Sequence, residues 1–189
     1  MGRSTGLEPA TLGTTNRCSN QLSYDRRKRP WTRRDASLRV GGEYGKARRG
    51  DVNATIEKFG YPATLVRDYH HWVLLVRPSQ VTAGSLILAA KSDVTAYGEL
   101  PTAAFTEQAT IVAEVEQMLR QTVKMEKINY LMLMMVDPHV HFHIFPRYRG
   151  ERSFAGLVLA DRGWPGPPDL KSAVELDSVA IGQAVESLR

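Results

Sequence analysis

Three of the five histidines in this chain stand at alternate positions, His139, His141 and His143. Alternate side chains of a β-strand project from the same face, so this spacing predicts three imidazoles in a row on one face of a strand. The residues between them are hydrophobic and can pack into a core on the opposite face: Val140, Phe142 and Ile144. Because a buried imidazole needs hydrogen-bond partners, such a row indicates a functional site rather than core filling.

Metal binding is one chemistry open to these histidines. Zn–N bonds are about 2.0–2.1 Å long, so the ligand nitrogens must converge on one point. Along a strand, residues i and i+2 are ~6.6 Å apart and residues i and i+4 about 13 Å. Two neighbouring histidines can therefore share an ion, but a third can hardly join them. A further ligand would be needed, and His70 and His71 are the only other histidines.

Binding of an extended anion, such as a chain of phosphates, is the second chemistry, and a linear row suits it better. An imidazole with its ordinary pKa of ~6.5 is mostly neutral at pH 7 and is then a competent nucleophile. Flanking imidazoles can donate hydrogen bonds to phosphoryl oxygens as charge develops in the transition state. The spacing therefore favours phosphate chemistry, with metal binding as the alternative.

The segment 139–147, His-Val-His-Phe-His-Ile-Phe-Pro-Arg, resembles the signature of the histidine triad (HIT) family. That signature is His-φ-His-φ-His-φ-φ, where φ is hydrophobic, and every position matches. The resemblance extends upstream through residues 127–135 and covers about 59–148 in the order of elements. It implies an α+β fold whose antiparallel sheet often pairs across a homodimer. It also implies a nucleotidyl hydrolase or transferase that acts on the α-phosphate of nucleotides, such as dinucleoside polyphosphates or nucleoside phosphoramidates.

The resemblance also assigns roles to the three histidines. His141 is expected to attack the α-phosphate and form a covalent nucleotidyl-histidine intermediate, which water then hydrolyses. His139 and His143 are expected to contact the phosphate, and the main-chain carbonyl of His139 to orient the His141 ring. No metal or other cofactor is implied. The alternative is a nucleotide-binding sensor with weak catalysis, because the apolar stretch 134–138 replaces the polar loop that many members carry.

Other candidate residues have two interpretations each. Asn129 matches an asparagine of one branch of the family and could bind phosphate, or it could be a hydrogen-bonding residue at a strand end. Arg147 could attract phosphate or be a solvated surface arginine. By analogy, Gln80 and Ser85 lie in the hairpin that faces the base and ribose, although turn or core roles are the alternative. Trp164 could cap a base, with structural packing as the simpler role.

The elements that must position these residues follow from the apolar pattern. Strands are expected at 72–77, 84–90, 128–135 and 139–145, the first two as a hairpin and the last ended by Pro146. One long amphipathic helix is expected over 101–124. Residues 150–170 are expected to form a loop, followed by a C-terminal helix that begins at a capping box of Ser172 and Glu175. Together with the fold that the resemblance implies, these elements predict an α+β class with a HIT-like antiparallel sheet, one long helix and a C-terminal helix.

The charge pattern divides the chain into two parts. Residues 1–50 contain 12 Lys/Arg and 4 Asp/Glu, whereas the rest contains 13 and 16. We expect 1–51 to be a disordered basic extension, which could be a nucleic-acid or acidic-partner tail, a targeting segment or a segment without a role. Residues 52–189 are expected to form one HIT-like domain, with its core at 59–148 and a C-terminal loop and helix at 149–189. Since that part is mildly acidic, it is not expected to bind nucleic acid.

Membrane and secreted classes are not expected. No apolar run approaches the ~20 residues of a membrane-spanning helix, and the first 30 residues lack the apolar region of a signal peptide. The single cysteine, Cys18, fits a reducing compartment. The sequence therefore predicts a cytoplasmic protein whose partner is a small nucleotide substrate.

Overall fold

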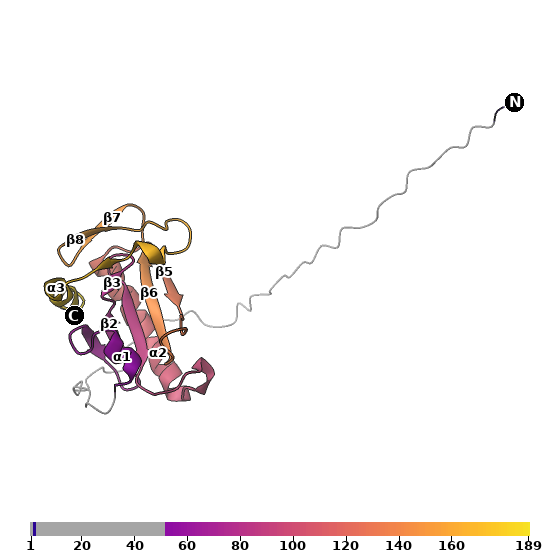
Figure 1. The fold of residues 1–189 in the computed structure, drawn as a ribbon, viewed down its shortest axis with the longest axis vertical. Helices are drawn as coiled ribbons and strands as arrows, with labels where there is room; N and C mark the ends of the chain where they lie inside the picture. Colours follow the sequence, from indigo (N-terminus) through magenta and orange to yellow (C-terminus); the bar gives the residue numbers. More distant parts are fainter. Residues whose placement is uncertain (1, 3–51) are drawn as a thin grey trace, which may run out of the picture. The chain divides into compact units, whose positions relative to one another are not determined.

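The computed structural model describes residue 2 and residues 52–189 (Figure 1). The predicted extension over 1–51 lies outside them apart from residue 2. The described part contains a five-stranded antiparallel sheet, two two-stranded sheets and three α-helices, so the predicted α+β class is confirmed. None of its helices combines the length and the apolar character needed to span a membrane. The elements in chain order are α1 (Ala54–Lys58), β1 (Leu65–Asp68), β2 (Trp72–Val76), β3 (Ser79–Gln80), β4 (Leu86–Ala90), η1 (Tyr97–Glu99), α2 (Thr102–Thr122), β5 (Lys127–Leu131), β6 (His141–Arg147), β7 (Glu151–Phe154), β8 (Leu157–Ala160), η2 (Leu170–Ser172), β9 (Val174–Glu175) and α3 (Ser178–Ser187).

The main sheet has the strand order β1-β2-β4-β6-β5, which puts the histidine strand β6 between β4 and the edge strand β5. On the β4 side, Ala89 pairs with His141 and Ile87 with His143. On the β5 side, Leu131 pairs with His143. Since directly paired residues project from the same face, His143 is flanked by apolar side chains on both sides and His141 by Ala89 on the β4 side.

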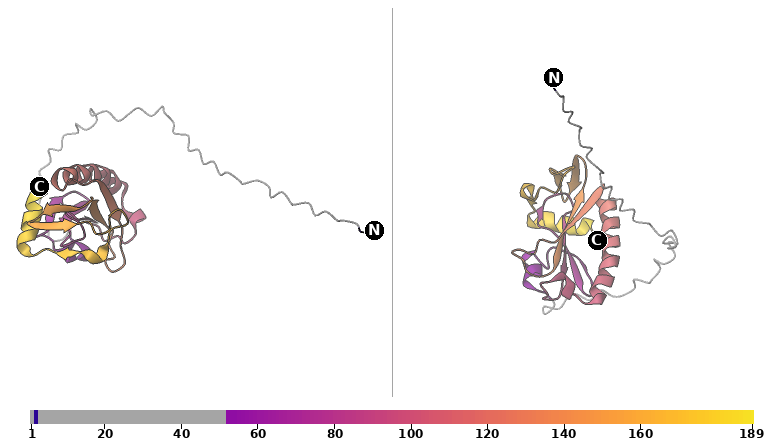
Figure 2. Two further views of the ribbon diagram at one scale, coloured as in Figure 1. Left: turned by 90° about the horizontal axis from the view of Figure 1, so that it is seen from above. Right: turned by 90° about the vertical axis from the view of Figure 1, so that its right-hand side faces the viewer.

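The two faces of the sheet are covered by different helices, α2 on one and α1 on the other (Figure 2). The face under α2 holds the larger core, to which Val140 and Ile144 belong, as predicted. Within it the indole N–H of Trp72 donates to the Ala104 carbonyl at 2.9 Å. The face under α1 holds a smaller cluster that includes Ile56 and Ile87. The face of the sheet that carries the histidines is therefore partly covered by α1.

Helix α2 confirms the predicted long amphipathic helix, with Pro101 as its N-cap residue rather than in its first turn. Its buried residues are Ala104, Ile111, Val115 and Leu119. Val112, which the apolar pattern of this helix includes, is only half-buried, whereas the adjacent Ile111 is fully buried.

The strand bounds differ from the prediction, most of all at β5 and β6. β5 ends at Leu131, so residues 132–135 belong to the connection that follows it. β6 begins at His141 rather than His139 and runs through Pro146 to Arg147. Pro146 is tolerated because the ladder with β4 ends at Ile144, so the missing N–H leaves no β4 partner unpaired.

The C-terminal part of the structure differs most from the sequence prediction. The expected loop over 150–170 contains the hairpin β7–β8, which turns at Ala155 and Gly156 with φ of 51° and 76°. Positive φ at both turn residues is the geometry of a tight hairpin. The capping box was wrong: Val174 and Glu175 form β9, which pairs with β3, and α3 starts after Asp177. Pairing between segments so far apart in sequence has no local signal. The sequence interpretation also missed α1 and β1.

Candidate active site

Strand β6 buries two of the three histidines at the middle of the sheet. His141 is fully buried and His143 is 7% exposed. His139 precedes the strand, so the predicted row of three on one strand is corrected to a pair on the strand and one residue beside it. The predicted alternation of faces holds within β6, because Phe142, between the two histidines, packs against the core on the opposite face of the sheet.

The tautomer of His141 follows from one contact. Its Nδ1 lies 2.8 Å from the carbonyl oxygen of His139, which is the contact that the resemblance implied. A carbonyl oxygen can only accept, so Nδ1 carries the proton and donates. In the neutral ring the Nε2 atom then holds an in-plane lone pair. His141 is therefore oriented to act as a nucleophile through Nε2.

His143 contacts that same nitrogen, with the two Nε2 atoms 3.2 Å apart. Because Nε2 of His141 holds a lone pair, Nε2 of His143 must carry the proton and donate. Nδ1 of His143 is then unprotonated, and it is buried without a hydrogen-bond partner. The pKa of His143 is lowered to about 4, chiefly by burial and also by the neighbouring His141 and Arg77, while Asp137 acts in the opposite direction. His143 is thus a neutral donor near pH 7.

The imidazole of His139 is held from the side of α1. Its Nδ1 lies 2.9 Å from the hydroxyl of Thr55, and its Nε2 lies 4.0 Å from a carboxylate oxygen of the exposed Asp93. The structure therefore brings the rings of His141 and His143 together. His139 contacts this pair through its main-chain carbonyl, whereas its ring contacts Thr55 and lies near Asp93.

Helix α1 supplies a functional-site residue that the sequence interpretation missed. The ring of Phe59, at its C-cap, lies 5.5 Å from the His141 ring and 5.7 Å from the His143 ring, centroid to centroid. Asn53 fixes the other end of α1: its Oδ1 accepts from the Ile56 N–H, and its Nδ2 donates to the Ala90 carbonyl at 2.9 Å. An asparagine in front of a short apolar segment was the available signal.

Arg147, the last residue of β6, is buried and contacts the half-buried Asn129 of β5. Nε and Nη2 of Arg147 donate to the Asp161 carboxylate at 2.7 and 3.1 Å, and Nη2 also donates to the Gly166 carbonyl at 2.9 Å. Its Nη1 donates to Oδ1 of Asn129 at 2.7 Å. The guanidinium is buried and its charge is balanced by Asp161. The surface alternative for Arg147 was therefore wrong, and phosphate binding by these two residues stays a prediction.

Gln80 and Ser85 are both buried and bonded to each other. Oε1 of Gln80 accepts from the Ser85 N–H at 2.9 Å, and its Nε2 donates to the Ser85 carbonyl at 3.0 Å. The Ser85 hydroxyl donates to the Thr82 carbonyl at 2.7 Å. Both side chains thus stabilise the turn before β4, which was their alternative role. Contact with a nucleotide stays a prediction for them.

The connection before His139 is apolar and open to solvent at its tip. Met135 is 90% and Val136 81% exposed. Asp137 is held to α1 by an ion pair with Lys58 at 2.5 Å.

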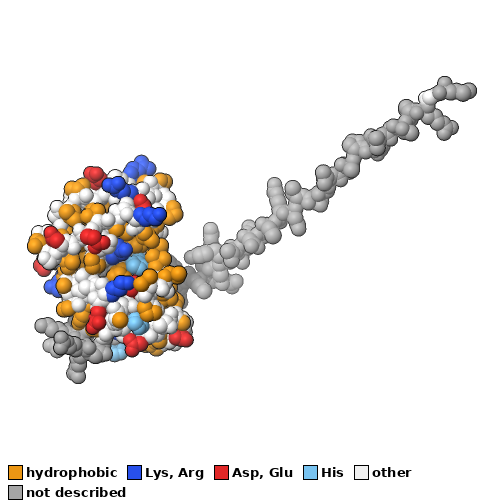
Figure 3. Space-filling model, viewed as in Figure 1, with side chains coloured by type: hydrophobic (Ala, Val, Ile, Leu, Met, Phe, Trp, Pro, Cys, Tyr) orange, Lys and Arg blue, Asp and Glu red, His pale blue; other side chains and the backbone are white. Residues whose placement is uncertain are grey.

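Histidine atoms reach the surface in Figure 3 beside basic and hydrophobic side chains. Within residues 52–189, no three His, Cys, Asp or Glu side chains are grouped to hold a metal ion.

Comparison with known proteins relates this chain by structure alone. No protein-family model and no curated protein matches it. A histidine triad protein from Bradyrhizobium japonicum superposes with a TM-score of 0.56 at 18% identity, over 72% of this chain and 93% of that one. One from Marinobacter aquaeolei VT8 gives 0.52 at 18% identity, over 70% and 96%. A HIT-like protein from Bartonella henselae, described as involved in cell-cycle regulation, gives 0.52 at 12% identity, over 72% and 91%. At these identities the likeness establishes the fold.

Proposed function

We propose that this chain, which has the fold of histidine triad proteins, is a nucleotidyl hydrolase that uses His141 as its nucleophile. The observation that carries the proposal is the 2.8 Å contact between Nδ1 of His141 and the His139 carbonyl, which leaves Nε2 unprotonated. The complete signature over 139–145 supports it.

The reaction divides into two displacements at the α-phosphorus. In the first, the Nε2 lone pair of His141 forms an N–P bond, and the bond from phosphorus to the leaving group breaks with its electron pair. The resulting imidazolium keeps its Nδ1 proton. The His139 carbonyl stabilises the positive charge by accepting a hydrogen bond from this N–H group. In the second, water attacks phosphorus, the N–P electron pair returns to Nε2, and the water proton passes to solvent.

His143 favours a phosphate leaving group over an amine. A departing phosphate leaves as an anion and needs no proton, whereas the amine of a phosphoramidate must be protonated as it leaves. His143 is a neutral hydrogen-bond donor, because burial lowers its pKa to about 4. The stretch 132–137 offers no hydroxyl or amide side chain. These features support phosphoanhydrides, such as dinucleoside polyphosphates, as the substrate class.

The test is release of a nucleoside monophosphate from a diadenosine polyphosphate, with and without EDTA. Activity should survive EDTA, and His141→Ala should lower kcat by several orders of magnitude, because the substitution removes the nitrogen that attacks phosphorus. A short reaction with α-labelled nucleotide should give a transient adduct on the protein that His141→Ala lacks.

His70→Ala is the matched control, because His70 is an exposed histidine whose ring packs against the neighbouring His71. It should keep full activity. Near-normal turnover by a folded His141→Ala protein would refute the mechanism, and loss of activity to a chelator would favour the metal-dependent alternative.

A catalytically weak nucleotide sensor is the second candidate. The exposed apolar tip at Met135 and Val136 favours it, since this segment offers no polar side chain toward a phosphate. Tight binding of the same compounds without turnover would select the sensor. The homodimer implied by the resemblance stays a prediction that light scattering can test.

A further inference from the structure

Arg77 directly follows β2 and lies on the face of the sheet that carries the histidine pair. Its main-chain N–H donates to the Ser85 carbonyl at 3.0 Å, so the pairing of β2 with β4 extends by one residue at this end. Side chains two positions apart in a strand share a face, and Leu75 belongs to the apolar cluster under α1. The side chain of Arg77 is therefore on the α1 side of the sheet, as are His141 and His143.

Phe145 connects the Arg77 guanidinium with the histidine pair. The Cζ atom of Arg77 lies 5.9 Å from the centroid of the Phe145 ring. The ring of His143 stacks on the same phenyl ring, with centroids 6.1 Å apart and 10° between the planes. The pKa of His143 is lowered chiefly by burial, then by His141, and the charge of Arg77 adds to this effect. Arg77 therefore belongs to the surroundings of the proposed nucleophile.

The guanidinium of Arg77 has no anionic partner among the described residues. Its Nε and Nη1 atoms are buried, and no described residue accepts a hydrogen bond from them. Burial lowers the pKa of Arg77 and the carboxylate of Glu175 opposes this, but no carboxylate in the described part of the chain forms an ion pair with Arg77. An arginine stays protonated in a protein, so the positive charge persists. Arg77 as a whole is half-buried, so a ligand can reach its side chain from solvent.

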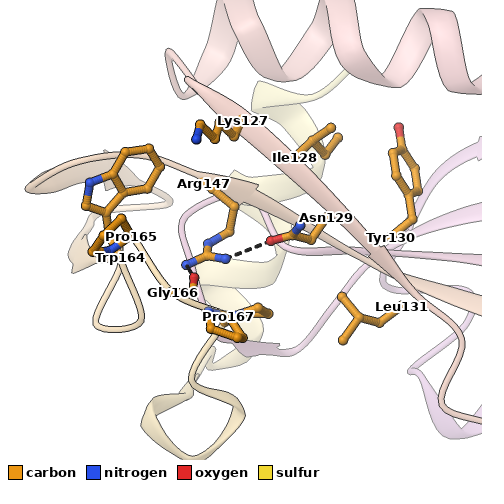
Figure 4. Close-up of a pocket in the computed structure, with 11 residues that line it drawn as sticks. Lys127, Ile128, Asn129, Tyr130, Leu131, Arg147, Trp164, Pro165, Gly166 and Pro167 are labelled. Carbon is orange, nitrogen blue, oxygen red and sulfur yellow. Dashed lines mark hydrogen bonds between the residues drawn. The ribbon is translucent and has the colours of Figure 1, made fainter. Parts of the chain in front are cut away.

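Arg147 provides the contrast, because protein groups surround its guanidinium. It donates to the carboxylate of Asp161, and Figure 4 shows it held between Asn129 and Gly166. The charge of Arg147 is therefore neutralised within the fold. Arg77 has no such neutralisation, and an unpartnered charge costs free energy unless a bound anion offsets it.

The row of the sheet that contains Arg77 is the one next to the row of His143. Arg77 and Phe145 both lie opposite Ser85, on its two sides, and form one row across the strands. His143 lies two residues before Phe145, about 6.6 Å back along the strand. A guanidinium fork suits the oxygens of a phosphate, which it can bind bidentately. An anion at Arg77 is thus a second group, next to the phosphate that His141 attacks.

We propose that Arg77 is a specificity-determining residue, which binds a phosphate group of the substrate other than the one attacked by His141. The inference rests on the proposed function for the position of the reacting phosphate. It adds that the preferred nucleotide carries a second phosphate that the reaction itself does not require, either on its sugar or further along its phosphate chain.

The experiment measures binding in the full chain carrying His141→Ala, so that nothing is turned over. Four ligands are titrated by calorimetry: AMP, ADP, adenosine 2′,5′-bisphosphate and adenosine 3′,5′-bisphosphate. Since hydrogen bonds between charged groups are strong, at least one of the last three should bind about tenfold more tightly than AMP. A gain for ADP places the second phosphate in the chain, and a gain for one of the bisphosphates places it on the sugar.

Arg77→Met should abolish this preference and leave the affinity for AMP nearly unchanged, because methionine keeps part of the aliphatic stem but not the charge. Arg77→Gln is the second variant and should behave in the same way. Arg77→Lys keeps the charge without the fork and should retain part of the preference. The melting temperature of Arg77→Met should not fall, since the substitution removes a charge that has no partner in the fold.

Arg162→Met is the matched control, because Arg162 is an exposed arginine in the segment after β8. It should leave the preference unchanged. Equal affinities for all four ligands when Arg77 is present would overturn the proposal. So would folded Arg77→Met and Arg77→Gln proteins that keep the preference. Loss of affinity for AMP by the same factor as for the other ligands would also overturn it, because Arg77 would then serve the reacting phosphate.

The two proposals fail separately. If wild-type protein prefers the second phosphate through Arg77 but hydrolyses no nucleotide, the hydrolase proposal fails and the role of Arg77 stands. If wild-type protein hydrolyses a diadenosine polyphosphate while Arg77→Met and Arg77→Gln keep the preference, the hydrolase stands and the role of Arg77 is refuted.

Discussion

At the scale of single residues, the two imidazoles on β6 are joined by one hydrogen bond. In the free protein the Nε2–H of His143 donates to the lone pair with which His141 would attack. An anionic phosphoryl oxygen is a stronger acceptor than an imidazole nitrogen. We infer that an incoming phosphate takes over this hydrogen bond and thereby frees the His141 lone pair. The nucleophile is then released only when a substrate is present.

His143 should make the stability of the protein depend on pH. Its pKa is lowered from 6.5 to about 4, so the unfolded chain binds this proton first as the pH falls. The stabilisation is present above about pH 6.5 and is lost between there and about pH 4, with a total on the order of 3 kcal/mol. The measurement is the free energy of unfolding in urea at several pH values in this range.

His143→Gln should flatten this part of the pH profile whatever its effect on stability at pH 7. His70→Gln, at an exposed site, serves as the control and should keep the wild-type slope. The same slope in His143→Gln as in wild type would contradict the assignment.

At the scale of elements, α1 decides what covers the histidine pair. Five residues are too few for a helix that is stable by itself, so tertiary contacts must hold it. The Asn53 side chain supplies them, because it caps α1 and also donates to the carbonyls of Ala90 and Ser92. α1 in turn holds Phe59 against both rings.

Asn53→Ala should therefore affect both stability and activity. Loss of the cap alone costs about 1 kcal/mol, and the two donated hydrogen bonds add to that. We expect a fall of about 2 kcal/mol in the free energy of unfolding, with a lower kcat/KM because Phe59 is no longer held. Glu57→Ala, at an exposed position of the same helix, should change neither. Full activity in Asn53→Ala would show that α1 does not support the site.

At the scale of the whole molecule, the fold and the proposed site lie within residues 52–189. Among the described residues, the two apolar clusters on the faces of the sheet extend from Val52 to Leu188. The excess of basic residues lies before it. We propose that 52–189 is the folding unit, as the charge pattern predicted.

A protein made of residues 52–189 should fold and act like the full chain. Its melting temperature should lie within a few degrees of the full-length value, and its kcat on a diadenosine polyphosphate should be similar. Differential scanning calorimetry and the hydrolysis assay measure the two. A large loss of stability would place residues before 52 in the folding unit.

The sequence by itself determined the fold class, the long helix and the strand that carries the histidines. These depend on local periodicity: alternate histidines select a strand face, and the apolar face of 102–122 selects a helix. Alternation also placed Val140 and Ile144 correctly in the core.

Only the tertiary structure decided which partners each side chain meets. The Arg147–Asp161 pair, the contact of Phe59 with the histidines and the pairing of β3 with β9 join residues far apart in the chain. Local composition carries no record of such contacts. The same holds for Trp164, whose place beside Lys127 depends on a loop fixed by Arg147. The candidate histidines could thus be identified from their spacing, but their hydrogen-bond partners and surroundings follow from long-range packing.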